Sequence, residues 1–175
     1  MGVKFQIIHE DQKAEGTDVA KIVGISEKLS QFFDPKENEG NLSIRCSVGN
    51  SFVIKKTGSK LTNMKEEDVV LVTKIGGNEV FANGTPSSEA RMHYEIYCKL
   101  NGVNIVLHFH DNKLMDNKGL KIEEIGPFEY GTSEVAEAAT QSLKSTDFIK
   151  LRKHGFILVA SNEKELFDRL GELYK

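Results

Sequence analysis

Tryptophan is absent from this sequence of 175 residues, and cysteine and proline occur only two and three times. The two cysteines, Cys46 and Cys98, lie far apart and form no CxxC pair, so we expect two free thiols in a reducing compartment. No apolar run approaches the roughly 18 residues of a membrane helix, and residues 1–10 lack the apolar core of a signal peptide. These absences argue against a disulfide framework, a membrane segment and secretion, and they predict a cytoplasmic protein.

Positive charge is neither abundant nor clustered. The chain has 23 Lys and Arg against 26 Asp and Glu, a net charge of −3, and its basic residues are scattered among acidic ones. Nucleic-acid binding needs a basic face, so we do not expect that activity. The chain does have 39% hydrophobic residues and enough length for one sizeable core, which predicts a single domain over residues 1–175.

Hydrophobic periodicity predicts many short strands and a few helices. Alternating or continuous apolar segments predict strands, and apolar residues at helical spacing after Ser, Thr, Asp or Asn predict helices. We expect strands at residues 3–8, 42–46, 51–55, 69–75, 79–82, 103–110, 122–125, 147–153 and 156–160, helices at residues 17–33, 86–101, 132–143 and 162–173, and a polar loop at residues 111–121. This pattern favours an α/β fold, with helices on the faces of an antiparallel or mixed sheet.

The segment 103–110 (VNIVLHFH) is an apolar strand that ends in His-x-His. Residues two apart in a strand point to the same face, so His108 and His110 project together while Phe109 points away. Two imidazoles side by side can bind zinc or a similar divalent cation. The alternative is one packed and one solvent-exposed histidine at a strand end, which a motif this short does not exclude.

Two further residues fit a catalytic metal site. His154 precedes Gly155 at the hinge between two predicted strands, where a side chain can be aimed and a backbone can come close. Three histidines and an open position are typical of catalytic zinc, although a surface turn is the simpler interpretation of His154 alone. Glu89, in the first turn of a predicted helix, is either a favourable partner of the helix dipole or a general acid/base near the metal.

The other two histidines are weaker candidates. His93 follows Glu89 by four residues and therefore shares its helix face, so both could reach one metal. Packing beneath the sheet is the simpler interpretation of His93. His9 has no evident partner in the sequence, and we expect it at the surface.

Three turns rich in glycine and hydroxyl side chains could bind a phosphate group. They are formed by Gly40 and Asn41, by Thr57 and Gly58, and by Ser87 and Ser88. Each turn offers backbone N–H groups and short donors, and the helix after Ser88 would add its dipole. Such a site needs no lysine or arginine, in agreement with the scattered basic residues. Each turn alone is an ordinary turn or helix cap.

Taken in order, these motifs resemble the class II aldolase/adducin family, and in particular its L-fuculose-phosphate aldolase branch. The matching segments are GNLSIR at 40–45, KTG at 56–58, PSSE at 86–89 with MH at 92–93 and IY at 96–97, VLHFH at 106–110, and HG at 154–155. The resemblance covers about residues 40–161, most of the chain. Each motif is weak alone, but five motifs in the right order are specific.

The resemblance implies a three-layer α/β/α sandwich with a mostly antiparallel central sheet. It implies a homotetramer with active sites at subunit interfaces. A zinc ion, or another divalent cation, would be bound by His108, His110 and His154, and Glu89 would be the acid/base. The substrate phosphate would be held by Gly40, Asn41, Thr57, Gly58, Ser87 and Ser88.

The implied activity is that of a zinc-dependent aldolase, which reversibly cleaves a phosphorylated sugar into a dihydroxyacetone-phosphate-like ketone and an aldehyde without a lysine Schiff base. The cation would act as a Lewis acid. A dehydratase of the methylthioribulose-phosphate type uses similar histidines and a glutamate, and is the nearest alternative enzyme. A non-catalytic, adducin-like assembly module is the alternative from another class. It predicts loss of the metal histidines, yet all three are present.

Two departures from the family pattern concern the aldehyde end of the site. The segment between His110 and His154 and the C-terminus are both shorter than in the family, which places there tyrosines that help protonate the aldehyde oxygen. Tyr130 and Tyr174 are the candidates in this chain, and neither matches the motif. The resemblance therefore specifies metal and phosphate binding more firmly than the aldehyde, and the substrate can be smaller than or different from the family's.

Overall fold

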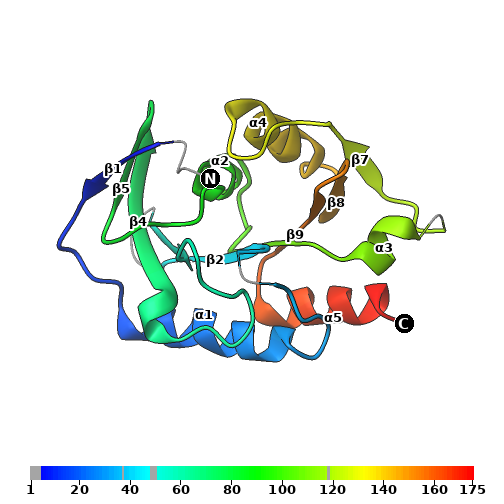
Figure 1. Cartoon of the computed structure of the whole chain (residues 1–175), viewed down its shortest axis with the longest axis horizontal. Helices are drawn as coiled ribbons and strands as arrows, with labels where there is room; N and C mark the ends of the chain where they lie inside the picture. The colour runs from blue at the N-terminus through cyan, green and yellow to red at the C-terminus, as the bar shows by residue number, and fades with distance from the viewer. Residues whose placement is uncertain (1–4, 37, 48–50, 118) are drawn as a thin grey trace.

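The computed structural model describes residues 5–36, 38–47, 51–117 and 119–175, in which a mixed sheet lies between two layers of helices (Figure 1). The strands are β1 (Gln6–His9), β2 (Asn41–Arg45), β3 (Phe52–Lys55), β4 (Val69–Gly76), β5 (Glu79–Ala82), β6 (Ile105–Phe109), β7 (Glu123–Ile125), β8 (Phe148–Leu151) and β9 (Gly155–Ala160). The helices are α1 (Gly16–Leu29), α2 (Ala90–Lys99), α3 (Asn112–Asp116), α4 (Ser133–Ser142) and α5 (Glu163–Leu173), with a short 3-10 turn at Glu66–Asp68. The expected α/β/α sandwich is confirmed, although the first two residues of the strand predicted at 3–8 lie outside the described residues.

Within the described residues the sheet has nine strands, in the order β1-β5-β4-β3-β2-β6-β9-β8-β7. Only the outermost pairs, β1 with β5 and β7 with β8, are parallel among the described strands, so the expectation of a mostly antiparallel sheet is confirmed. β2 and β6 lie side by side in the middle, and Asn41 is directly opposite His108 in their register. The centre of the sheet therefore joins two segments that the sequence analysis singled out independently.

The two faces of the sheet are covered by different helices. Helices α1 and α5 pack on one face, which we call the α1/α5 face, and α2 and α4 pack on the other, the α2/α4 face. Alternation along β6 sends Leu107 and Phe109 to the core of the α1/α5 face and Val106 to that of the α2/α4 face. His108 follows the same alternation as Val106, so it lies on the α2/α4 face at the end of the strand.

Local capping accounts for the helices that were located most accurately. The Thr132 hydroxyl accepts a hydrogen bond from the Val135 N–H, and the Asn162 side chain accepts one from the Glu165 N–H at 3.0 Å. Such caps depend on residues three positions apart, so they can be read from sequence. No helix among the described residues is both long enough and apolar enough to cross a bilayer.

The predicted end of the first helix and the predicted loop at residues 111–121 were wrong. Helix α1 ends at Leu29 rather than near residue 33, because the chain turns at Ser30 and sends Phe32 and Phe33 into an aromatic cluster with Tyr174. The predicted loop at 111–121 contains helix α3. The Asp111 carboxylate caps this helix by accepting from the Leu114 N–H at 2.9 Å, and Leu114 is buried.

Candidate active site

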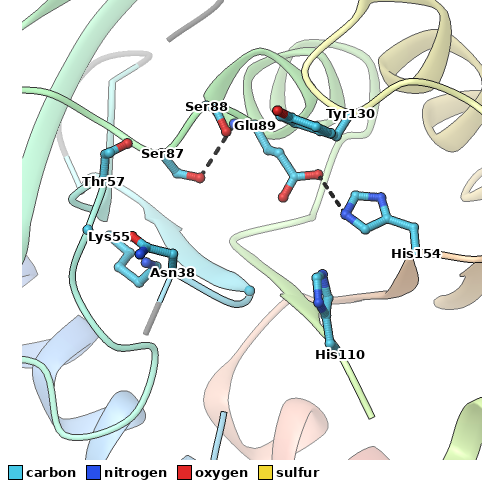
Figure 2. Close-up of a pocket in the computed structure, with 11 residues that line it drawn as sticks. Asn38, Lys55, Thr57, Ser87, Ser88, Glu89, His110, Tyr130 and His154 are labelled. Atoms are coloured by element: carbon cyan, nitrogen blue, oxygen red, sulfur yellow. Dashed lines mark hydrogen bonds and ion pairs between the residues drawn. The ribbon is translucent and has the colours of Figure 1, made fainter. Parts of the chain in front are cut away.

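A cavity of about 400 Å³ opens at the end of β6, beside the start of α2 (Figure 2). The residues that line it are Asn38, Gly40, Lys55, Thr57, Gly58, Ser87, Ser88, Glu89, His110, Tyr130 and His154. They come from six separate segments of the chain. All the predicted site residues are in this list except Asn41 and His108, which contact Glu89 and His110.

The three predicted metal ligands lie together. The ligand atoms of His108, His110 and His154 are all within 4.8 Å of one another, and the Nε2 atoms of His108 and His110 are 3.0 Å apart. His108 and His110 come from the end of β6, and His154 comes from the turn before β9, the strand that pairs with β6. His93 does not join this group. It is fully buried and bonds Ser43 instead, as its simpler interpretation predicted.

Two glycines allow the backbone to approach this histidine segment closely. A Cβ atom on Gly155 would lie 2.6 Å from the Phe109 carbonyl oxygen and 2.7 Å from a ring carbon of His110. A Cβ on Gly40, whose φ is +68°, would lie 2.6 Å from the His108 carbonyl oxygen. Contacts this short exclude any side chain, so both positions need glycine.

Protonation and hydrogen bonding suit the histidines to bind a cation. The Nδ1–H of His108 donates to the Phe156 carbonyl oxygen at 2.9 Å, which leaves the electron pair of Nε2 directed at the site. Burial lowers the pKa of His108, His110 and His154 to about 4 each, and proximity of the rings to one another contributes for the last two. At neutral pH the site therefore offers three uncharged imidazoles, the form that ligates metals.

Glu89 faces these imidazoles with its carboxylate. Its Oε2 atom is 3.2 Å from Nε2 of His108 and accepts a hydrogen bond from Nδ2 of Asn41 at 2.8 Å. Its Oε1 atom is 3.8 Å from Nε2 of His154 and has no hydrogen-bond partner among the described protein atoms. Because the histidines are neutral near pH 7, these contacts are not ion pairs. At His108, whose proton is on Nδ1, the contact places the electron pair of Nε2 against a carboxyl oxygen, which a proton or a bound cation between them would relieve.

Burial raises the pKa of Glu89, and His154 and the Asn41 hydrogen bond oppose this effect only in part. A carboxyl group with a raised pKa is suited to gain and lose a proton near neutral pH. The prediction that Glu89 sits in the first helical turn behind a hydroxyl cap was wrong. Glu89 is itself the N-cap of α2, and no side chain caps the helix.

The hydroxyl-rich turns form one wall of the cavity. The Thr57 hydroxyl donates to the Pro86 carbonyl oxygen at 2.8 Å, so the turn at 57–58 is tied to the turn at 87–88. The Ser87 hydroxyl accepts from the Glu89 N–H at 3.4 Å, and Figure 2 draws this contact. Ser87 and Ser88 thus stand beside Glu89 at the cavity instead of capping α2.

Lys55 and Asn38 also line the cavity, and the sequence analysis missed both. Lys55 is only 2% exposed, its Nζ donates to the Ser59 carbonyl oxygen at 2.6 Å, and burial lowers its pKa to about 8. The sequence analysis described turns that could bind a phosphate without lysine or arginine, and the structure places one lysine in the same cavity. The available signal was a lysine that directly follows the apolar residues of β3, since a charge on a buried central strand needs a reason.

The two candidate tyrosines have different positions. Tyr130 lines the cavity, with its ring centre 6.4 Å from that of His154. The Tyr174 hydroxyl donates to the Asp111 carboxylate at 2.7 Å and lines a second cavity on the far side of His110. His9 is exposed as expected, 3.8 Å from a carboxylate oxygen of Asp11.

A buried carboxyl group beside three histidines, open to a cavity walled by hydroxyl groups and a lysine, is consistent with a divalent-metal site on an α/β/α sandwich. Residues 21–175 match the family model of the class II aldolase and adducin N-terminal domain, and the chain belongs to this family. The resemblance in the motifs is thereby confirmed.

Individual relatives are aldolases of sugar phosphates by name. The chain is 33% identical over 144 residues to L-fuculose phosphate aldolase of Methanococcus maripaludis, with 73% of this chain and 76% of that protein covered. It is 27% identical over 169 residues to 5-deoxy-D-ribulose 1-phosphate aldolase of Bacillus thuringiensis serovar kurstaki, with 87% and 79% covered. The structure of l-fuculose-1-phosphate aldolase from Thermus thermophilus superposes with a TM-score of 0.72 at 22% identity, covering 91% and 88%, which supports the fold.

Proposed function

We propose that this protein is a divalent-metal-dependent aldolase, with zinc as the expected cation, that reversibly cleaves a phosphorylated sugar into a dihydroxyacetone-phosphate-like ketone and an aldehyde. The observation that carries the proposal is the convergence on Nε2 of His108, which has Nε2 of His110 and Oε2 of Glu89 within 3.2 Å. Family membership and the names of the relatives support the same reaction class.

In this proposal His108, His110 and His154 hold the cation. When bound there, it supplies Lewis-acid chemistry to oxygen atoms of the substrate. The three rings are positioned by β6 and β9 and by the hydrogen bond from His108 to Phe156, so their donor atoms are arranged before the ligand arrives. Such fixed second partners are typical of metal-binding histidines.

Glu89 is the proposed acid/base. Asn41 holds its Oε2 atom, so Oε1 is the oxygen that exchanges a proton with the substrate. In cleavage the carbon–carbon bond breaks, its electron pair stays on the ketone fragment, and that carbon takes a proton from Oε1. The hydroxyl of the other fragment gives its proton to water as the aldehyde forms, and the Glu89 carboxylate regains a proton from water, so the step balances. In the reverse direction, Oε1 removes the proton from the same carbon of the ketone before the aldehyde adds.

The phosphate is proposed to lie against the wall of hydroxyl-rich turns. Gly40, Thr57, Gly58, Ser87 and Ser88 supply neutral donors there. The buried ammonium group of Lys55 adds the single positive charge among the side chains that line the cavity. Asn41, which we expected at the phosphate, donates its amide to Glu89, so the proposal assigns it to the carboxylate.

The assembly and location implied by the family are also part of the proposal. We expect a homotetramer with active sites between subunits. Its support here is Phe128, which is 41% exposed, lies two residues before Tyr130 of the cavity lining and would be covered by a neighbouring copy. Light scattering measures the mass of the assembly in solution directly and so tests the tetramer. Both Cys46 and Cys98 are free, as suits a cytoplasmic protein.

The test is metal analysis followed by a cleavage assay. Elemental analysis of the parent protein should give about one divalent cation per chain, and the His108→Ala/His110→Ala double variant should give little. His9→Ala, which changes an exposed histidine outside the site, is the matched control and should keep the metal.

A screen of sugar phosphates, beginning with L-fuculose 1-phosphate, should then yield an aldehyde and a phosphorylated ketone with the parent. Loss of water instead of carbon–carbon cleavage would show that the protein is a dehydratase and not an aldolase. A parent that takes up no zinc, cobalt or manganese would overturn the proposal and leave a non-catalytic module.

A further inference from the structure

Beside the proposed active site, polar side chains of β2 face polar side chains of α2 in matching order. The pairs are Asn41 with Glu89, Ser43 with His93, and Arg45 with Tyr97. Two residues along a strand advance roughly 6.8 Å and four residues along a helix roughly 6.0 Å, so the two periodicities stay in step for three pairs. We call these six residues the polar ladder.

Close contacts join the residues of each pair, the Ser43 hydroxyl joins the second pair to the third, and the backbones of β2 and α2 join the first pair to the second. Nδ2 of Asn41 donates to Glu89 at 2.8 Å, and the Ser43 hydroxyl lies 2.6 Å from Nδ1 of His93 and 2.7 Å from the Tyr97 hydroxyl. At the far end, the Arg45 guanidinium donates to the Tyr97 carbonyl oxygen at 2.7 Å and lies 4.8 Å from its ring centre. Every ladder residue except Arg45 is buried.

The ladder also contains most of the unpartnered polar atoms in the described interior. These are Oδ1 of Asn41, Oε1 of Glu89 and Nε2 of His93, and the one further such atom is Nε of Arg169. Buried polar groups are normally paired, because an unpaired one costs free energy. Three of them in one short row, ending at Glu89, indicate a row arranged for Glu89 rather than for stability alone.

The protons of the ladder can be ordered in two directions. Burial lowers the pKa of His93 to about 3, so its ring is neutral and carries one N–H. In one order, Tyr97 donates to Ser43, Ser43 donates to Nδ1 of His93, and the ring proton is on Nε2. In either order Nε2 of His93 has no partner among the described protein atoms. The reverse order also leaves the proton of the Tyr97 hydroxyl without an acceptor, because the Ser43 oxygen that would accept it is then the donor. The first order therefore leaves fewer buried groups unpaired, and it directs both hydroxyl donors toward the Glu89 end.

We propose that the polar ladder is a positioning device for Glu89. Ser43 and His93 fix α2 against β2, and His93 carries its proton on Nε2. In this position Asn41 donates its hydrogen bond to Oε2 of Glu89, which leaves Oε1 facing the substrate. This role rests on the proposed function of Glu89 as acid/base. Ser43, His93 and Tyr97 are not among the residues that line the cavity, so they act through Glu89 and not on the substrate.

Paired tyrosine variants test the ladder. Tyr97 and Tyr94 are on the same helix and both rings lie against Phe52, at 5.4 and 6.4 Å between centres, but only Tyr97 bonds Ser43. In the metal-loaded protein, Tyr97→Phe should lower kcat about tenfold with KM nearly constant, because Glu89 is displaced while substrate binding is kept. Tyr94→Phe should leave kcat and KM unchanged.

Variants of Ser43 extend the test. Ser43→Ala should lower kcat at least as much as Tyr97→Phe, with unchanged metal content, and Ser43→Cys, which keeps a weak donor, should recover part of the loss. Unchanged kcat in both Tyr97→Phe and Ser43→Ala would overturn the ladder, as would a loss that follows only the folded fraction or the metal content. If Ser43→Ala does not fold, the comparison of Tyr97→Phe with Tyr94→Phe tests the proposal alone, and equal kcat values in these two variants would overturn it.

The histidine tautomer provides a readout that does not need turnover. In zinc-loaded protein labelled with ¹⁵N-histidine, with the signals of His93 assigned by their disappearance in His93→Gln, the ring should be neutral with its proton on Nε2. A proton on Nδ1, or a charged ring near pH 7, would overturn the ladder's order. A parent that cleaves no sugar phosphate but has the Nε2–H form would instead point to failure of the proposed function.

Discussion

Both faces of the central sheet bury an apolar core, but near the centre of the sheet the α2/α4 face also buries polar side chains from the same strands. On the α1/α5 face, β2 and β6 place Leu42 and Leu107 in a core of aliphatic and aromatic groups. The very next residues, Asn41 and His108, are equally buried but lie on the α2/α4 face, where they contact Glu89. Because neighbouring residues of a strand point to opposite faces, one residue contributes to the site while the next contributes to the apolar core.

The difference between buried apolar and buried polar side chains shows which of them contribute to stability and which to activity. Burial of apolar groups on the α1/α5 face stabilises the fold, whereas buried polar atoms on the α2/α4 face are only partly paired and cost free energy. The unpartnered atoms of Asn41, Glu89 and His93 all belong to that second face. A substitution among the polar side chains beside Glu89 should therefore affect activity, and one in the apolar core of either face should affect folding.

The largest expected effect is that of Glu89→Gln on turnover. The amide keeps the size of the side chain but cannot transfer a proton, so kcat should fall roughly 10²- to 10⁴-fold. Metal content and melting temperature should be retained, because a buried carboxyl is replaced by a neutral group. Steady-state kinetics and elemental analysis check this, and loss of the metal would count against the acid/base role.

Leu107→Ala tests the opposite face, one residue from His108. Leu107 is fully buried, and its truncation should lower the free energy of unfolding by about 2–5 kcal/mol. Because the side chain points away from the cavity, kcat per folded molecule and metal content should be unchanged. Urea unfolding and kinetics on the same samples separate the two effects. A fall in kcat without destabilisation would break the distinction between the faces.

Lys55→Met should weaken substrate binding more than turnover. Removing a charged donor from the cavity should cost about 1.5–3 kcal/mol of binding, or roughly a 10- to 100-fold rise in KM. Lys56→Met changes the next residue, which is exposed, and is the matched control that should leave KM constant. Equal effects of the two variants would mean that Lys55 does not contact the phosphate.

The pH dependence of KM should follow the same lysine. Burial lowers the pKa of Lys55 from 10.5 to about 8, against the opposing charges of Asp68 and Glu89, so its ammonium is lost as pH rises through 8. KM should therefore rise above pH 8 in the parent and not in Lys55→Met. The free energy of unfolding depends on pH in the opposite direction to substrate binding. Between pH 8 and 10.5 the unfolded chain holds a proton that folded Lys55 has released, so this group's contribution to the free energy of unfolding increases with pH.

The smallest effect is expected for a surface contact of the α1/α5 layer. Lys28 of α1 forms an ion pair with Glu163 of α5, and the lysine side chain is 56% exposed. Exposed pairs contribute little, so Lys28→Ala should change the free energy of unfolding by less than about 1 kcal/mol. Thermal melting at low and high salt measures this change, and kcat should stay constant.

Much of this architecture could be predicted from local sequence, because the signals involve neighbouring residues. The caps at Thr132 and Asn162, the alternation along β6 and the pairing of His108 with His110 each depend on residues two or three positions apart. Helix α3 was missed because its five residues are too few for hydrophobic periodicity to appear.

What could not be predicted depends on contacts between distant segments. Asn41 follows a glycine in a turn-like motif, which suggested phosphate, yet its amide reaches Glu89, 48 positions further along the chain. The position of Lys55 directly after apolar residues is a signal for burial, but its contacts with the Ser59 carbonyl oxygen and the cavity wall have no local signature.

The ends of the sheet determine how this protein can meet its own copies. Each outer strand is short, with four residues in β1 and three in β7, and β7 exposes Glu123 and Glu124. Glu124 is paired with Lys150 and Arg152, so a strand from another chain that added to this edge would have to cover a cluster of charges. Short, charged edges of this kind oppose edge-to-edge aggregation. Copies of the chain that associate should therefore join through helices and loops, and a growing β-sheet should not form from the folded state.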